Sequence, residues 1–496
     1  MTLLGIFPVS HLSESLLLLV ASLLVIAAVL VAKVGSRLGA PSLLLFLLLG
    51  MLAGPDVLGL RVEDYPLAES VGHFAMTIIM FHAGLNTSLQ ETKPVMKQGL
   101  LLSTVGVLMT VLLTGLFLWR ISAAAIALPL LSCFLLASVM SSTDSASVFA
   151  VLGEKQVKLK ERLGPMLELE SGSNDILAYM LTIIFVKFLS TDAAATQGGW
   201  MMFGNGLLVL LVQIAVGLAV GLAVGHGAKW ALDRIHLPGF ALSSILVLSF
   251  GFFADGLSSL LYGNGLLALY VTAIILGNKS FILKSKEIRH FFGGLTWLMQ
   301  LLMFLLLGLM ARPSQMLPLL LPAMLVGAFM MLVARPAGVF LCLLPFKGLS
   351  WRAKTLVSWV GLKGAGPILF ALCPLVAGLA HSDQMFNMVF LVTLFSLLVQ
   401  GSSLSRAALL LRLTYPEPPV ADTFGMDIPE EMGSLRSHVV TEEDLARGTT
   451  LRGLHLPHGI RVMMVRRGER FLVPHGSMSL ECGDILMIIM GESDDD

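Results

Sequence analysis

Apolar runs of about 16 to 30 residues, separated by short polar stretches, cover most of this 496-residue sequence. Each run is long enough to cross the ~30 Å hydrocarbon core of a bilayer as a helix. The first run lacks a cleavage site and is long enough to span, so we interpret it as a helix and not as a removed signal peptide. The sequence therefore predicts thirteen spans, at about residues 12–33, 40–55, 67–90, 96–119, 123–152, 162–190, 203–229, 238–256, 262–277, 293–311, 316–345, 352–379 and 384–411.

The pattern changes near the C-terminus. Residues 413–433 are rich in proline and acidic residues, which predicts a linker after a transmembrane domain at 1–412. Short β-type runs at 461–466, 470–473 and 485–490 follow, and glycine-containing turns separate them. Residues 434–496 therefore form a small β-rich domain. No GxGxxG run indicates a dinucleotide cradle in it.

Basic residues lie mainly in alternate loops between the predicted spans. The loops on one side carry 19 lysines and arginines, against three on the other (Arg61, Arg120 and Arg312). By the positive-inside rule the basic side is cytoplasmic, so the N-terminus is periplasmic and the C-terminal domain is cytoplasmic in a bacterial inner membrane.

Composition excludes several classes of function. Hydrophobic residues make up 56% of the chain and charged residues 13%, whereas soluble domains have roughly 25% charged residues. The net charge is zero, which gives no indication of nucleic-acid binding. The four cysteines are far apart without a CxxC pair, so we expect neither a disulfide framework nor a transition-metal site. No HExxH or GxSxG motif indicates an enzyme, and no cofactor is expected.

Span five carries five consecutive polar residues, at 141–145, which include Thr143 and Asp144. Small hydroxyl side chains can satisfy backbone groups that local unwinding frees. An unwound centre would present carbonyl oxygens and a helix N-terminus to a bound ion. The alternative is an ordinary helix whose serines and threonine pack on neighbouring helices.

Span six carries Glu168, Glu170, Ser171, Asn174 and Asp175. At 100° per residue, Asp175 lies nearly above Glu168 and close to Ser171, while Glu170 and Asn174 share the neighbouring face. Carboxylate, hydroxyl and carbonyl oxygens suit a hard cation. Asp175 is about two turns deeper than Glu168, which could instead lie at the cytoplasmic interface.

Two basic residues lie in the last spans. Arg335 is deep in span eleven, where a lone guanidinium is costly, so we expect it to pair with Glu170. Lys363 lies among three glycines and a proline in span twelve, which predicts a second broken helix; the alternative is a lysine that snorkels to the interface. The two breaks occupy corresponding positions if spans 1–6 and 8–13 are inverted repeats, as in transporters.

These stretches resemble the NhaP-type monovalent cation:proton antiporters of the Na⁺–H⁺ exchanger superfamily, in particular their K⁺/H⁺ antiporters of the cell volume regulation protein A group. The resemblance rests on SSTDSASVFAVLG at 141–153, LELESGSND at 167–175 and SWVGLKGAGPI at 358–368. Residues 466–491 resemble the TrkA-C (RCK-C) regulatory domain of K⁺-transport proteins. The resemblance implies an all-α fold with about thirteen helices, inverted repeats and two broken helices.

The resemblance also implies roles for individual residues. Asp175 would bind both ion and proton, with Asp144 and the Thr143 backbone beside it. Ser171 would complete the site. Glu170 and Arg335 would form a structural ion pair, and an Asn174-Asp175 pair is typical of electroneutral exchangers.

Two departures from the family pattern concern expected modulators. His82 stands where relatives often carry an acidic residue, and Lys363 stands where arginine is usual. His82 could equally be a hydrogen-bonded helix histidine. The C-terminal domain could bind a small-molecule ligand or only stabilise a homodimer.

The sequence thus predicts exchange of K⁺, with Na⁺ or Rb⁺ as further ions, for H⁺ across the membrane. A cation and a proton would compete for Asp175, because a bare buried carboxylate costs several kcal/mol. A Na⁺/H⁺ antiporter with the same site is the alternative. A regulated K⁺ efflux channel is a third interpretation, but no TVGYG-like filter run supports it.

Overall fold

The computed structural model forms two compact units, Met1–Thr414 and Tyr415–Asp496. Nearly all of the predicted linker lies outside the described residues. Those residues are 7–8, 14–38, 41–62, 64–125, 128–144, 147–149, 152, 159–191, 199–235, 239–279, 286–346, 348–414, 435–440, 444–445, 448–454, 460–467 and 470–490.

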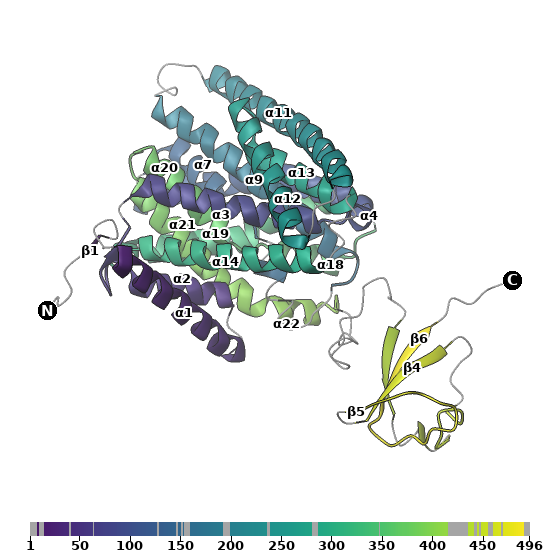
Figure 1. Ribbon diagram of the computed structural model, residues 1–496. Coiled ribbons are helices and arrows are strands. Elements are labelled where there is room, and N and C mark those ends of the chain that lie inside the picture. The colour runs from purple at the N-terminus through teal and green to yellow at the C-terminus, as the bar shows by residue number, and fades with distance from the viewer. Residues whose placement is uncertain are drawn as a thin grey trace. The chain divides into compact units, whose positions relative to one another are not determined.

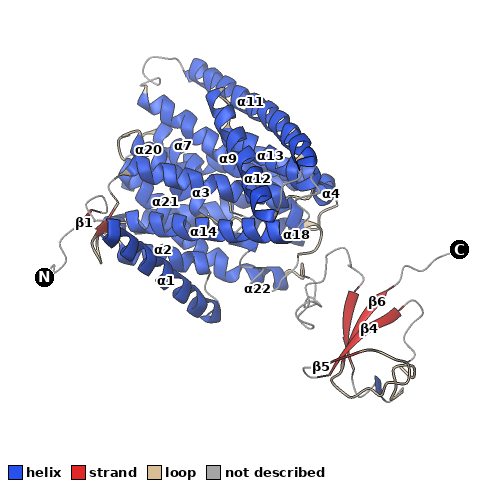
Figure 2. Cartoon of the chain, viewed as in Figure 1, coloured by secondary structure: helices blue, strands red, loops and turns tan. Residues whose placement is uncertain are grey.

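The first unit is a bundle of helices (Figures 1 and 2). Each of the thirteen predicted spans coincides with one helix or with consecutive helices. Within the described ranges, seven helices are long and apolar enough to cross a membrane, and five shorter helices are also apolar. The mostly helical fold is therefore confirmed, while the crossing of all thirteen spans and the inverted repeat stay predictions.

Seven helices pack mainly on one another and are called the scaffold group. Glycines allow two of them, α2 and α14, to approach closely: a Cβ added at Gly308 would lie 2.8 Å from the Cα of Gly50. In Figure 1, α1, α2, α14 and α3 lie side by side. The scaffold group comprises α1 (Glu14–Leu38), α2 (Ser42–Ala53), α3 (Tyr65–Asn86), α11 (Gly199–Arg234), α12 (Phe240–Leu260), α13 (Gly265–Lys279) and α14 (Lys286–Met310).

Most of the other helices form the core group. It meets the scaffold group where α3 packs on α9, α19 and α20, where α13 packs on α9, and where α14 packs on α19. The core group comprises α5 (Met96–Leu101), α6 (Val107–Ala125), α7 (Leu130–Val139), α9 (Leu163–Ser190), α16 (Leu320–Phe329), α17 (Arg335–Leu343), α18 (Trp351–Trp359), α19 (Ala365–Phe370), α20 (Leu372–Val376), α21 (Ser382–Ser396) and α22 (Ser402–Leu410).

A π-helical turn, Met330–Ala334, directly precedes Arg335 and Pro336 in the core group. Proline has no N–H and its ring clashes with the preceding helical turn, so a wider turn accommodates it without ending the helix. The π turn and the proline together position Arg335 deep in the bundle, where its side chain is buried.

The second unit contains an antiparallel sheet of order β3-β6-β4-β5. Three strands, β4 (Ile460–Arg467), β5 (Arg470–Leu472) and β6 (Ile485–Met490), lie where the sequence predicts them, whereas β3 (Leu435–Val439) was not predicted. Val465, Leu486 and Ile488 supply the centre of its small apolar core. The predicted β-rich C-terminal fold is confirmed.

Candidate ion-binding site

The helices of spans five and twelve are both interrupted, and the interruptions meet. Helix α7 ends at Val139, and helical backbone resumes at Ser147; α18 ends at Trp359, and α19 begins at Ala365. The Asp144 amide donates to the carbonyl of Leu362 (2.9 Å), which joins the two extended segments. This crossing places polar backbone and helix ends in the interior of the bundle, where discontinuous transporter helices bind ions.

Lys363 stabilises the carbonyl side of the crossing. Its side chain is buried, and its Nζ donates to the carbonyls of Ser142 (2.8 Å) and Ser141 (3.4 Å), just beyond the end of α7. A cation is favourable at a helix C-terminus, where carbonyls lack partners. Its backbone N–H donates to Ser396 (3.0 Å), so the lysine is fixed at both ends. The alternative of snorkelling to the interface is therefore wrong.

Asp144 begins the helical turn that follows the first break. Its carboxylate accepts hydrogen bonds from the Ser147 amide (3.1 Å) and the Ser147 hydroxyl, as an N-cap does. Gly364 of the second break lies so close that a Cβ there would overlap the Asp144 carboxylate. Glycine at this position is therefore required for the two breaks to approach one another.

Asp175 lies on α9 against the first break. Its side chain is buried, and its Oδ1 accepts a hydrogen bond from the Ser142 hydroxyl. Gly366 lies beside it: a Cβ at this position would lie 3.9 Å from Oδ1 and only 3.2 Å from the Ser142 hydroxyl oxygen. The carboxylate thus faces the crossing, on the same side of α9 as Ser171, and this shared side is what the helical spacing predicts.

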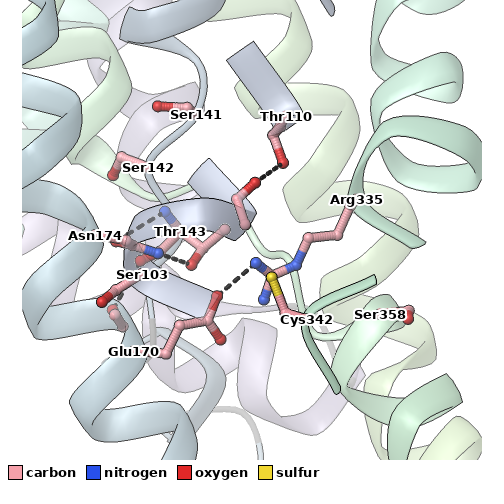
Figure 3. Close-up of polar contacts among 12 residues, drawn as sticks. Ser103, Thr110, Ser141, Ser142, Thr143, Glu170, Asn174, Arg335, Cys342 and Ser358 are labelled. Carbon is pink, nitrogen blue, oxygen red and sulfur yellow. Dashed lines mark hydrogen bonds and ion pairs between the residues drawn. The ribbon is translucent and has the colours of Figure 1, made fainter. Parts of the chain in front are cut away.

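Two neighbours of Asp175 hold the backbone of the break. Ser171 donates to the carbonyl of Thr143 (2.7 Å). The Asn174 amide donates to the Thr143 hydroxyl, and its oxygen accepts from the Thr143 amide (3.4 Å) (Figure 3). These contacts fix the orientation of Thr143 at the crossing.

Glu170 and Arg335 form an ion pair between α9 and α17, as Figure 3 shows. Both side chains are buried, at 1% and 8% exposure, so neither charge is screened by water. Arg335 also packs against the second break, because a Cβ at Gly361 would lie 3.3 Å from its Cγ. The pair therefore links α9, α17 and the second break. Its two charges neutralise each other, and Asp175 takes no part in the pair.

Two cavities lie at opposite ends of the boundary between the groups, with Asp175 between them along α9. The cavity at the Asn86 end of α3, of about 300 Å³, is called the inner cavity after the predicted orientation, and its polar lining is His82, Asn86, Glu168, Thr296 and Gln300. The outer cavity, of about 550 Å³, has Glu69, Ser70, His73, Thr77, Tyr179, Asp255 and Ser259 as its polar lining. Along the helix, Asp175 is about 10 Å from Glu168 and about 6 Å from Tyr179.

Comparison with known proteins identifies the architecture. Residues 21–410 match the family model described as "Sodium/hydrogen exchanger, transmembrane". The chain belongs to the sodium/hydrogen exchanger family. Residues 435–494 match the TrkA-C domain. This exchanger is therefore a cation/proton antiporter with a TrkA-C domain, which agrees with the family resemblance of its motifs.

Similar proteins cover nearly the whole exchanger. The K(+)/H(+) antiporter NhaP2 of Shewanella oneidensis is 37% identical over 474 residues, which is 95% of this chain and 80% of that protein. The K(+)/H(+) antiporter NhaP of Alkalimonas amylolytica is 33% identical over 464 residues, 93% of this chain and 76% of that protein. The sodium proton antiporter MjNhaP1 of Methanocaldococcus jannaschii shares the fold, with a TM-score of 0.67 at 22% identity, over 79% of this chain and 97% of that chain.

The exchanger brings most of the predicted residues together and separates two of them. The residues in contact at the crossing are Thr143, Asp144, Ser171, Asn174, Asp175 and Lys363. His82 and Glu168 lie apart from it, in the lining of the inner cavity. There the His82 ring is hydrogen-bonded to Asn86 (2.9 Å).

Sequence reasoning missed some polar residues of this region. In the sequence Ser142 is only one of five consecutive polar residues, yet it supplies the hydroxyl that faces Asp175. In the outer cavity, Nε2 of His73 lies 3.5 Å from Oδ2 of Asp255, which joins α3 to α12. Asp255 lies inside an apolar run, and a carboxylate at that position is the sequence signal that could have identified it as a candidate functional residue.

Proposed function

We propose that this antiporter exchanges K⁺ for H⁺ at Asp175. One observation carries the proposal: a buried carboxylate at the crossing accepts a hydrogen bond from a neutral hydroxyl, while the ammonium of Lys363 donates to backbone carbonyls. The carboxylate is therefore available to either ion. Because leaving it bare and buried costs several kcal/mol, the carrier changes its access only when a cation or a proton occupies it.

The charges around the crossing support electroneutral exchange. Asp144 and Lys363 have opposite charges, and so do Glu170 and Arg335. Asp175 is then the unmatched charge of these five residues, so one K⁺ or one H⁺ makes the set neutral. A one-for-one exchange moves no net charge.

Two further features support alternating access. The inner and outer cavities lie at opposite ends of the boundary between the core and scaffold groups. Gly172 lies between Glu168 and Asp175 on α9, and the Tyr270 hydroxyl of α13 packs against it. A Cβ added at Gly172 would lie 2.5 Å from that hydroxyl oxygen. We propose that the core group moves along this narrow contact and opens one cavity at a time to Asp175.

Potassium is the proposed ion because relatives that match 93–95% of the chain bear the name K(+)/H(+) antiporter. The Na(+)/H(+) antiporter NhaH of Halobacillus dabanensis matches only 56% of it. The basic loops support an inner-membrane location with the C-terminal domain in the cytoplasm. That domain would respond to a small ligand or stabilise a homodimer, and deleting residues 434–496 separates these roles by their effects on flux and on oligomeric state.

The test is cation-induced dequenching of a pH-gradient dye in everted vesicles, with K⁺, Rb⁺, Na⁺ and Li⁺, and with and without an imposed membrane potential. We expect K⁺ and Rb⁺ to dissipate the gradient, without dependence on the potential. Asp175→Asn should abolish exchange while the protein remains in the membrane, and Asp144→Asn should abolish it or raise the apparent KM. Near-normal exchange by Asp175→Asn would end the proposal, and a response to Na⁺ alone would favour the sodium alternative.

A further inference from the structure

The inner cavity holds features of a second cation site. We propose that it binds an alkali cation with part of its hydration shell, with Glu168 as the anionic ligand and Thr296 and Gln300 as neutral oxygen ligands. This inference rests on the proposed function of Asp175, because the second site would supply that residue with K⁺.

Three helices supply the polar lining of this cavity. Asn86 and His82 come from α3, Glu168 from α9, and Thr296 and Gln300 from α14. The volume of about 300 Å³ is roughly that of ten water molecules, at about 30 Å³ each in the liquid. The cavity therefore has room for a cation that retains several waters.

Thr296 gives independent evidence of a ligand. Its side chain is 7% exposed, and among the described residues its Oγ1 has no hydrogen-bond partner. Buried hydroxyls are normally hydrogen-bonded, so an unpartnered one that lines a cavity indicates a ligand or an ordered water there. Gln300, 6% exposed, lies one helical turn further along the same face of α14.

The electrostatics of the cavity favour a cation. Glu168 carries the carboxylate, and Glu91 of α4 (Leu89–Thr92) adds a second negative charge to the field at it. No lysine or arginine lines this cavity in the part of the chain that the structure describes. The carbonyl and hydroxyl oxygens around the carboxylate are the ligands that hard cations prefer.

The position of the cavity fits a site ahead of Asp175. Glu168 and Asp175 are seven residues apart on α9, which places them on nearly the same face, about 10 Å apart. A cation held at Glu168 would need to move about two helical turns to reach the crossing. The site would therefore raise the local K⁺ concentration on this side without taking part in proton exchange.

The first test compares transport kinetics from the two sides of the membrane. In everted vesicles, Glu168→Gln should raise the apparent KM for K⁺ about fivefold, the effect of one unit charge about 4 Å away in a water-filled cavity. Thr296→Val should raise it about threefold through loss of one neutral ligand. In right-side-out vesicles both variants should show an unchanged KM, and Vmax should be unchanged in both preparations.

Matched controls separate the site from general effects. Thr393→Val removes another buried hydroxyl without a partner among the described residues, on α21 and away from the cavity. Glu91→Gln removes an exposed negative charge on the same side. We expect neither to change the KM as much as the corresponding cavity variant. Equal effects of Glu91→Gln and Glu168→Gln would show a general surface potential and overturn the proposal.

A binding measurement makes the two proposals distinguishable. Purified full-length Asp175→Asn should retain weak ⁸⁶Rb⁺ binding, and adding Glu168→Gln should remove it. Absence of ⁸⁶Rb⁺ binding by Asp175→Asn, together with an unchanged KM in Glu168→Gln, would overturn the second site and leave exchange at Asp175 intact. Exchange by Asp175→Asn would instead contradict the proposed function.

Discussion

The ion pair between Glu170 and Arg335 allows a quantitative prediction. Both side chains are at least nine-tenths buried, so Glu170→Ala leaves a guanidinium without its counter-charge in the core group. Removing one partner of such a pair costs about 3–5 kcal/mol, which raises the unfolded fraction roughly 10²- to 10⁴-fold. Replacing both residues with apolar ones is often close to neutral. Glu170→Ala with Arg335→Met should therefore recover most of the lost stability.

The assay is thermal melting of the solubilised protein, monitored by size-exclusion chromatography with fluorescence detection. It compares the wild type, both single variants and the double variant. A coupling energy of at least about 2 kcal/mol is expected. Asp233→Ala is the control, because it breaks the partly exposed pair with Lys229 on α11 and should cost less than about 1 kcal/mol. A double variant as unstable as Glu170→Ala would refute the pairing as the source of stability.

Two further predictions concern Lys363 and the C-terminal sheet. Lys363→Met removes the positive charge that faces the Ser141 and Ser142 carbonyls and should abolish exchange, whereas Lys363→Arg should retain part of it. Equal flux from both variants would contradict the role of the charge. Burial alone would raise the pKa of Asp484, but hydrogen bonds from Arg467 and from the Glu481 amide outweigh burial and lower this pKa. Because the pKa is lower in the folded state, the carboxylate stabilises the sheet above the ordinary aspartate pKa of about 4, and that stability is lost as the pH falls through the folded value. The protection factors for hydrogen exchange in β4 and β6 of the full-length protein, corrected for the intrinsic exchange rate at each pH, should therefore fall in acid, and the same fall in Asp484→Asn would contradict this.

Much of the membrane domain could be predicted because lipid imposes simple rules on sequence. The lengths of the apolar runs predicted the spans. The free-energy cost of a charged side chain inside the membrane indicated Glu170, Asp175 and Arg335 as candidate residues. Helical periodicity also placed Asp175 correctly, because α9 is continuous through the site. Clustered hydroxyl residues in one span and glycines in the other marked the two breaks in the sequence.

Periodicity could not order the residues of the breaks themselves. In a non-helical segment side-chain directions follow no fixed angle, so the sequence did not show that Ser142 faces Asp175 while Thr143 faces Asn174. The sequence likewise did not show that Lys363 donates to the Ser142 carbonyl, because this hydrogen bond joins segments more than 200 residues apart in the chain. The cavities arise from packing between the two groups of helices, which hydropathy does not encode.

The central claim is that K⁺ and H⁺ compete for one carboxylate. The most direct test is proton release from the purified full-length protein, measured with a pH indicator in weakly buffered solution as K⁺ is added. The account predicts saturable release that approaches one proton per protein molecule at saturating K⁺, with none from Asp175→Asn. Potassium binding by the wild-type protein without proton release, or equal release from Asp175→Asn, would contradict it.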